Sequence, residues 1–267
     1  MSSGRTLALT VALCALGAAA LPAQSVARYS AGTRRYHLIS VVTRAEDRNG
    51  QHNEFKVTNE QIVSVALAAH GKDSLDFSYT MDSSSINSDP PITLPDISRM
   101  KGAQVHGVMG PTGKVFTYAS TADKNDPDMQ NLVEGMSRFL VVLPQNAKHG
   151  STWTDTTRNT VEQNGAHLNL TSIVTSTIID DTTFNGQTAW RVQRNILLSM
   201  GGTQSAMGQS VDIDGKGTGQ GIYYLSTSGV YLGSTSTQNM QMMIKQKETG
   251  ETVPVSQAVT SKVELIN

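Results

Sequence analysis

The stretch LDFSYTM at residues 75–81 places an apolar side chain at every second position, which is the spacing of a β-strand with one buried face. The stretch WRVQRNI at residues 190–196 repeats this register, and only Arg194 interrupts its apolar positions. Each stretch begins four residues after a glycine, Gly71 in the first case and Gly186 in the second. We therefore interpret the two stretches as equivalent strands, each entered through a hairpin turn.

Turn glycines recur at similar distances around both stretches. A further glycine follows the first after 42 residues in one case (Gly113) and after 43 in the other (Gly229). A third pair precedes them by 39 and 36 residues: Gly32 and Gly150. This spacing predicts an internal duplication with two β halves, at residues 29–122 and 146–267.

The segment between these halves has a different period. After Asp126 and Pro127, a favourable N-cap and N1 pair, apolar residues follow at steps of three and four as far as Leu140. We predict an amphipathic helix within a connecting segment at residues 123–145, ending before Pro144 and laid on the concave side of a sheet. A helix that lies on a membrane or on a partner is the alternative, but this one lacks a basic polar face.

The predicted fold class is therefore mainly β, with two related, curved, antiparallel and half-barrel-like sheets and one principal helix between them. Two stretches, at residues 83–102 and 201–221, have little alternation and are rich in proline or in glycine and serine. We expect both to be irregular and to lie at the same end of the molecule, although residues 211–214 have strand-like alternation.

Residues 1–23 have the pattern of a secretory signal peptide. Arg5 precedes a short apolar run that ends in small residues, and cleavage is expected after Ala23, with Ala20 as the alternative. A lipid-bearing Cys14 is the alternative, but Leu13 stands where a small residue is needed. The protein is expected in the periplasm or outside the cell, and the mature chain of about 244 residues would contain no cysteine.

The charge balance excludes several partners. The chain has 21 basic and 22 acidic residues, and loss of Arg5 leaves a net charge of −2. Neither a nucleic acid nor an anionic membrane surface is indicated. The apolar run near the N-terminus is too short for a membrane span.

No strong catalytic or metal signature appears, and we expect no cofactor. The six histidines have no paired spacing of the kind that zinc sites use. Residues 212–217 (DIDGKG) contain two carboxylates, as a calcium loop would, but the glutamate of such a loop is replaced by Tyr223, so a hairpin end is favoured. Residues 98–101 (SRMK) match the Ser-x-x-Lys motif of penicillin-recognising enzymes without its companion motifs.

Met240 and Met242 are expected to share one strand face, with Met243 on the other. Two thioethers on one face could bind Cu(I). Methionine is also an adaptable filler of apolar cores and cavities, which is the favoured interpretation.

The junction of the halves carries a resemblance. Pro144 precedes the stretch KHGSTWT at residues 148–154, which resembles the opening of a repeat in uncharacterised secreted bacterial β proteins, where a proline precedes a Gly-x-Thr-Trp strand start. The two-halved layout is similar to the curved, partly closed sheets of the LolA, LolB and LppX group, which carry lipoproteins or lipids. The resemblance implies a hydrophobic cavity beneath a helical cover.

The leading hypothesis is a non-enzymatic protein that binds an apolar ligand, lipid or lipoprotein-like, or an envelope partner in a curved β-sheet cavity. The alternatives are a structural or interaction protein of the cell envelope, which uses sheet edges, and a hydrolase whose residues assemble only in space. Eight residues are candidate liners of the cavity, with a place in the plain core as the competing interpretation: Phe77, Tyr79, Met81, Met136, Phe139, Trp190, Met240 and Met242.

Overall fold

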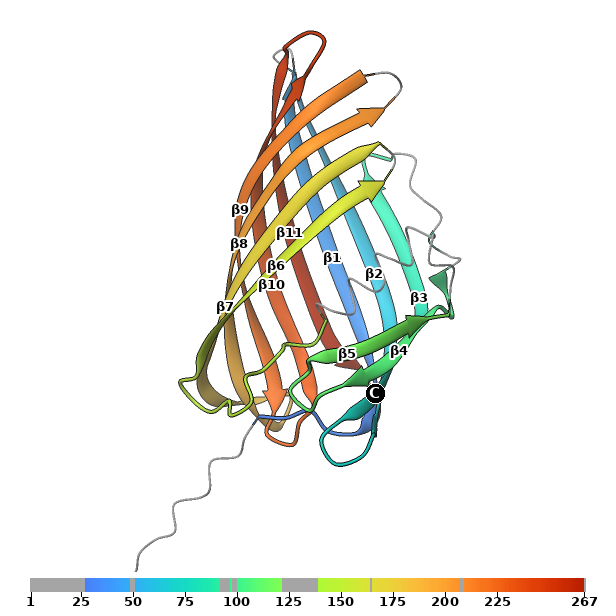
Figure 1. The fold of residues 1–267 in the computed structure, drawn as a ribbon, viewed down its shortest axis with the longest axis vertical. Coiled ribbons are helices and arrows are strands. Elements are labelled where there is room, and N and C mark those ends of the chain that lie inside the picture. Colours follow the sequence, from blue (N-terminus) through green and yellow to red (C-terminus); the bar gives the residue numbers. More distant parts are fainter. Residues whose placement is uncertain are drawn as a thin grey trace, which may run out of the picture.

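The fold was analysed in a computed structural model that describes residues 27–48, 51–91, 97, 100–121, 139–163, 165–206 and 209–266. The predicted signal peptide at residues 1–23 lies outside this range. Within the described residues, eleven strands form one antiparallel sheet (Figure 1). The strands are β1 (Gly32–Arg48), β2 (Gln51–Ala69), β3 (Leu75–Asp89), β4 (Gln104–Met109), β5 (Val115–Ser120), β6 (Thr152–Gln163), β7 (Ala166–Phe184), β8 (Gln187–Ala206), β9 (Gln209–Ser226), β10 (Tyr231–Gln246) and β11 (Thr252–Ile266).

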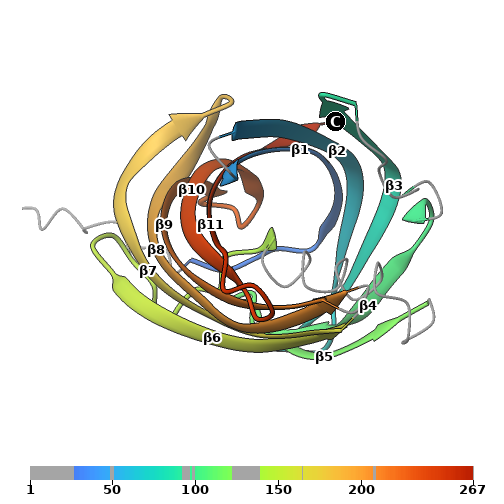
Figure 2. The same ribbon diagram turned by 90° about the horizontal axis from the view of Figure 1, so that it is seen from above.

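The sheet is a meander apart from one pairing between strands that are far apart in the sequence. Its strand order is β5-β4-β3-β2-β1-β11-β10-β9-β8-β7-β6, so that chain neighbours pair everywhere except between β5 and β6. The first and last strands, β1 and β11, pair with Tyr36 opposite Leu265. The sheet curls round so far that its edge strands, β5 and β6, come to the same side of the molecule (Figure 2).

The prediction of two sheets is wrong, because the pairing of β1 with β11 joins the two predicted halves into one sheet. The structure does not support the internal duplication either. Gly71, Gly113, Gly186 and Gly229 all lie in turns, with φ between +73° and +88°. Alternate turns of a meander fall at the same end of the sheet, so regular glycine spacing needs no duplication. Strand lengths also differ, since β4 and β5 have 6 residues each whereas β9 and β10 have 18 and 16.

The two stretches expected to be irregular are largely strand. Residues 83–89 belong to β3, residues 201–206 extend β8, and β9 runs through the glycine-rich residues 215–221. The DIDGKG stretch therefore lies inside a strand and not at a hairpin end, and Asp212 pairs with Lys247 at 3.1 Å. Neighbouring strands satisfy the backbone of this stretch, which overrides its weak intrinsic β-propensity.

One end of the curled sheet, here called the base, holds the main core. Alternate residues of each strand point inward there, for example Tyr36 in β1, Val63 in β2 and Val192 in β8, all at most 2% exposed. Because side chains alternate between the two faces of a strand, the same alternation determines which residues face the concave side in the parts of the strands that lie away from the base. Predicted strand faces at residues 75–81 and 190–196 are confirmed by the burial of their alternate residues.

Two chain segments, residues 27–31 and residues 139–147, cross the base and close it. Tyr29 donates its backbone N–H to the carbonyl of Pro111 and its hydroxyl to the carbonyl of Val141. The backbone N–H of Leu143 donates to the carbonyl of Thr112, and that of Ala27 to the carbonyl of Ala147. These bonds satisfy backbone groups that would otherwise be buried without partners.

Most of the predicted helix lies outside the described residues, which resume at Phe139. Phe139 is helical and residues 141–144 are irregular, so the described chain is no longer helical before Pro144. The carbonyl of Val141 accepts from the Tyr29 hydroxyl, and the backbone N–H of Leu143 donates to the carbonyl of Thr112. The prediction that a strand opens in the Gly-x-Thr-Trp motif is confirmed, since β6 begins at Thr152.

Candidate functional site

Away from the base, the side chains on the concave face are first mostly small or polar and then apolar. Pairing across the strands first aligns a row of mostly small or polar residues, here called the polar row: Asn59, Ser40, Ser261, Ser236, Gly221, Arg194, Ser176 and Trp153. Further from the base, three strands present a surface here called the apolar strip: Leu170 and Val174 in β7, Ile196, Leu198 and Met200 in β8, and Met240 and Met242 in β10. Most of the strip is only half-buried, unlike the base.

Between the β8 and β10 parts of the apolar strip, β9 presents only glycine. A Cβ atom at Gly217 would lie 2.5 Å from the backbone oxygen of Asn239, and one at Gly215 would lie 2.9 Å from Cγ of Met242. Strand β10 therefore lies closer to the concave side of β9 than a side chain would allow. This sharp bend brings Met240 and Met242 of β10 toward Met200 of β8, in one apolar cluster with Val253 and Val255.

The structure separates the predicted liners into two groups. Phe77, Tyr79, Met81, Phe139 and Trp190 lie in the core of the base. The ring of Phe139 lies 4.9–5.9 Å from those of three tyrosines, Tyr36, Tyr79 and Tyr231.

Met240 and Met242 lie instead in the apolar strip, and Met243 points to the opposite face, 49% exposed. Met136 lies outside the described residues. Whether any of these side chains contacts a ligand stays a prediction.

Sequence reasoning missed the polar groups of this face. In the described part of the chain, four buried side-chain atoms have no hydrogen-bond partner: Arg44 Nε, Asn59 Oδ1, Trp153 Nε1 and Arg194 Nε. All four side chains belong to the concave face. The interruption of the apolar alternation at Arg194 was the available signal, but the residues beside it come from strands far away in the sequence.

Burial dominates the electrostatics of the base. It raises the pKa of the Tyr29, Tyr36, Tyr79 and Tyr231 hydroxyls well above their ordinary value, so these groups stay neutral. At Tyr29 the positive charge of Arg194 acts in the opposite direction as a smaller effect on the pKa.

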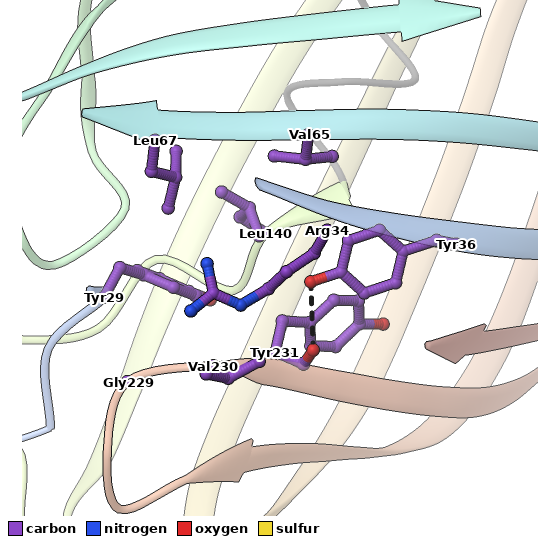
Figure 3. A pocket seen from close by; sticks show the side chains of 9 residues that line it. All are labelled: Tyr29, Arg34, Tyr36, Val65, Leu67, Leu140, Gly229, Val230 and Tyr231. Carbon is purple, nitrogen blue, oxygen red and sulfur yellow. Dashed lines mark hydrogen bonds between the residues drawn. The ribbon is translucent and has the colours of Figure 1, made fainter. Parts of the chain in front are cut away.

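A small pocket opens at the base (Figure 3). The Arg34 side chain extends across it from beside Tyr36 toward Tyr29, and the Tyr36 hydroxyl donates to the carbonyl of Tyr231 at 3.0 Å. The cavity volume is about 10 Å³, which is near the minimum for one water molecule. This pocket has no room for a hydrocarbon chain.

Among the described residues, no group of three or more histidine, cysteine or acidic side chains could hold a metal ion. In the same part of the chain, no helix has the length and apolar character needed to cross a membrane. Ser98 of the Ser-x-x-Lys match lies outside the described residues.

The β1–β2 hairpin carries a titratable pair. His52 Nδ1 lies 2.7 Å from Asp47 Oδ1, and this hydrogen bond raises the pKa of the exposed imidazole. The charged pair exists below the raised pKa and is lost as the pH rises through it. We expect Asp47→Asn to lower the pKa of His52 in an NMR titration, with the other histidine signals as the internal control. An unchanged midpoint would show that the pair does not form in solution.

The fold and the concave face together define a class of protein: an open and strongly curled antiparallel sheet with a closed base and an inner surface that is partly polar and partly apolar. No protein-family model matches the chain, and no curated protein matches it either. Among solved structures, it matches a domain from Vibrio parahaemolyticus described as an outer membrane lipoprotein-sorting protein domain. The identity is 9%, the match covers 86% of this chain and 83% of that one, and the TM-score is 0.18. At that score the likeness carries no functional argument.

Proposed function

We propose that this protein binds the hydrocarbon chain of a lipid or of an acylated envelope protein along its concave face, without catalysing a reaction. The supporting observation is the apolar strip, which faces inward and is left half-buried by the described residues. When a ligand covers an inward-facing apolar surface that the described residues leave half-buried, the free energy of the system falls.

The dimensions of the strip suit one acyl chain. From Ile196 to Met200 it follows β8 for about 13 Å, at ~3.3 Å per residue. One leaflet of a bilayer has a hydrocarbon thickness of about 15 Å, half of the whole apolar core. The proposal therefore keeps Met240 and Met242 as liners and assigns the predicted liners of the base to the core.

The predicted signal peptide at residues 1–23 would deliver this binding activity to the periplasm or the outside of the cell. Membrane lipids and acylated proteins are both present in that compartment. A non-enzymatic role agrees with the composition of the strip, whose side chains carry no titratable group.

Neighbouring residues of β8 provide a matched test. Leu198 faces the concave side, whereas Leu197 is 57% exposed on the other face. With the uncharged fluorescent probe N-phenyl-1-naphthylamine, we expect saturable binding that Leu198→Thr weakens about fivefold, since about 1 kcal/mol of apolar contact is lost. Threonine keeps the strand propensity at both positions.

The control variant, Leu197→Thr, should bind the probe as the wild type does. Equal effects of the two substitutions, or a wild-type signal that does not saturate, would contradict binding on the concave face.

A further inference from the structure

Arg194 occupies the boundary between the filled base and the apolar strip. Two residues toward the base, Val192 is 1% exposed and packs in the main core. Two residues the other way, Ile196 begins the strip. Arg194 is thus the cation at this end of the surface on which we place the hydrocarbon chain. One carboxylate, that of Asp155 in β6, also lies on the concave face, opposite Val174.

The charge of Arg194 has no neutralising partner in the described part of the chain. There Arg35, Arg44 and Arg191 each have a carboxylate within 4.0 Å, but Arg194 has none. Its guanidinium lies 4.9 Å from the ring centroid of Tyr223. Its Nε atom is buried and has no acceptor among the described residues.

A half-buried cation with an unused donor is costly, because the protein removes water from it without replacing the hydrogen bonds. An anion bound there would offset this cost.

A further donor lies near the guanidinium. Its two partners across the strands are small, Ser176 in β7 and Gly221 in β9. Beyond Ser176 lies Trp153, whose indole Nε1–H is also buried and has no acceptor in the part of the chain that the structure describes. Arg194 and Trp153 stand two strands apart, so about 10 Å separates their Cα atoms. Ser176 is 1% exposed, so the ligand's oxyanion would meet the two donors beside Ser176 only after the long side chains of Arg194 and Trp153 turn toward it.

We propose that Arg194 binds the oxyanion head group, carboxylate or phosphate, of a ligand whose acyl chain lies along the apolar strip. The inference rests on the proposed function and names the class of ligand, an anionic amphiphile. A guanidinium offers two parallel N–H donors that match the two oxygens of a carboxylate or phosphate. Trp153 supplies a further donor to the same head group.

The test compares three ligands that share one oleoyl chain: oleate, oleoyl lysophosphatidic acid and neutral monoolein. Each displaces N-phenyl-1-naphthylamine from the full-length protein. We expect the wild type to bind at least one of the anionic ligands about tenfold more tightly than monoolein. Preference for oleate, for the phosphate or for both identifies the head group. The preference should shrink as salt is raised from about 0.01 to 1 M.

Arg194→Gln should remove this preference and leave the affinity for monoolein within about twofold, which also shows that the variant folds. Arg194→Lys keeps the charge without the planar fork and should retain part of the preference. The matched control is Arg191→Gln, on the same strand but the opposite face, which should keep the wild-type preference.

Two results would overturn the inference: a wild type without preference for anionic ligands, or a preference that survives in Arg194→Gln. In both cases binding of the probe and of monoolein would leave the proposed function standing. Failure of the wild type to bind the probe and monoolein would contradict the proposed function itself.

Discussion

Replacing Phe139 with alanine is expected to lower the free energy of unfolding by about 3–5 kcal/mol. The side chain is 6% exposed and forms edge-to-face contacts with Tyr36, Tyr79 and Tyr231. These rings come from β1, β3 and β10, so one side chain joins distant parts of the curled sheet at its base. Its removal leaves a cavity among bulky rings that cannot collapse easily, and it also removes the aromatic pair contributions.

Urea unfolding followed by circular dichroism measures this change, provided that the slope with urea stays constant. The matched control is Phe116→Ala in β5, where the ring is 57% exposed; there we expect a change within about 0.5 kcal/mol. A loss below about 1 kcal/mol for Phe139→Ala would mean that the segment crossing the base is not packed as described. If Phe139 belongs to the core alone, the folded variant should still bind N-phenyl-1-naphthylamine with wild-type affinity.

Gly217→Ala is expected to destabilise the protein by about 1–3 kcal/mol, although alanine usually stabilises an extended chain relative to glycine. The added Cβ would lie 2.5 Å from the backbone oxygen of Asn239 and 3.1 Å from Cα of Met240. Backbone atoms cannot rotate away as a flexible side chain can, so β9 and β10 must separate. The same movement should carry Met240 away from β8 and weaken binding of the apolar probe.

Gly201→Ala in β8 is the control for this substitution. A Cβ there would meet only the backbone oxygen of Ile213, at 3.9 Å. Alanine at this position should be neutral or stabilising by up to about 1 kcal/mol in the same urea experiment. Equal stability changes in the two variants would show that the close approach of β9 and β10 does not exist.

The strand positions at residues 75–81 and 190–196 were predictable, because alternation along a strand is a local property that each stretch carries in its own side chains. The division of Met240 and Met242 from Met243 follows from the same rule. The glycine-rich part of β9 was not predictable. Its residues have little intrinsic preference for a strand, and the ladders with β8 and β10 that hold it extended come from elsewhere in the chain.

Only one polar residue of the candidate site could be predicted from the sequence. The sequence marks Arg194 as an interruption of an apolar face, and nothing more. That Ser176 and Gly221 lie on either side of it, and Trp153 beyond, depends on the register of four strands. Register is a collective result of hairpin turns and buried faces, so no single stretch encodes it.

By itself, the sequence determined that this protein is built from strands with one apolar face, because apolar and polar side chains alternate between neighbouring residues. The tertiary structure decided how those faces are used. Pairing of β1 with β11 made one sheet of two predicted halves, and the glycines of β9 allowed that sheet to bend until β8 and β10 approached each other. The base was filled by its own side chains, whereas the apolar strip was left half-buried beside an arginine with no carboxylate partner in the described residues. These outcomes depend on contacts between residues far apart in the chain, which local patterns do not specify.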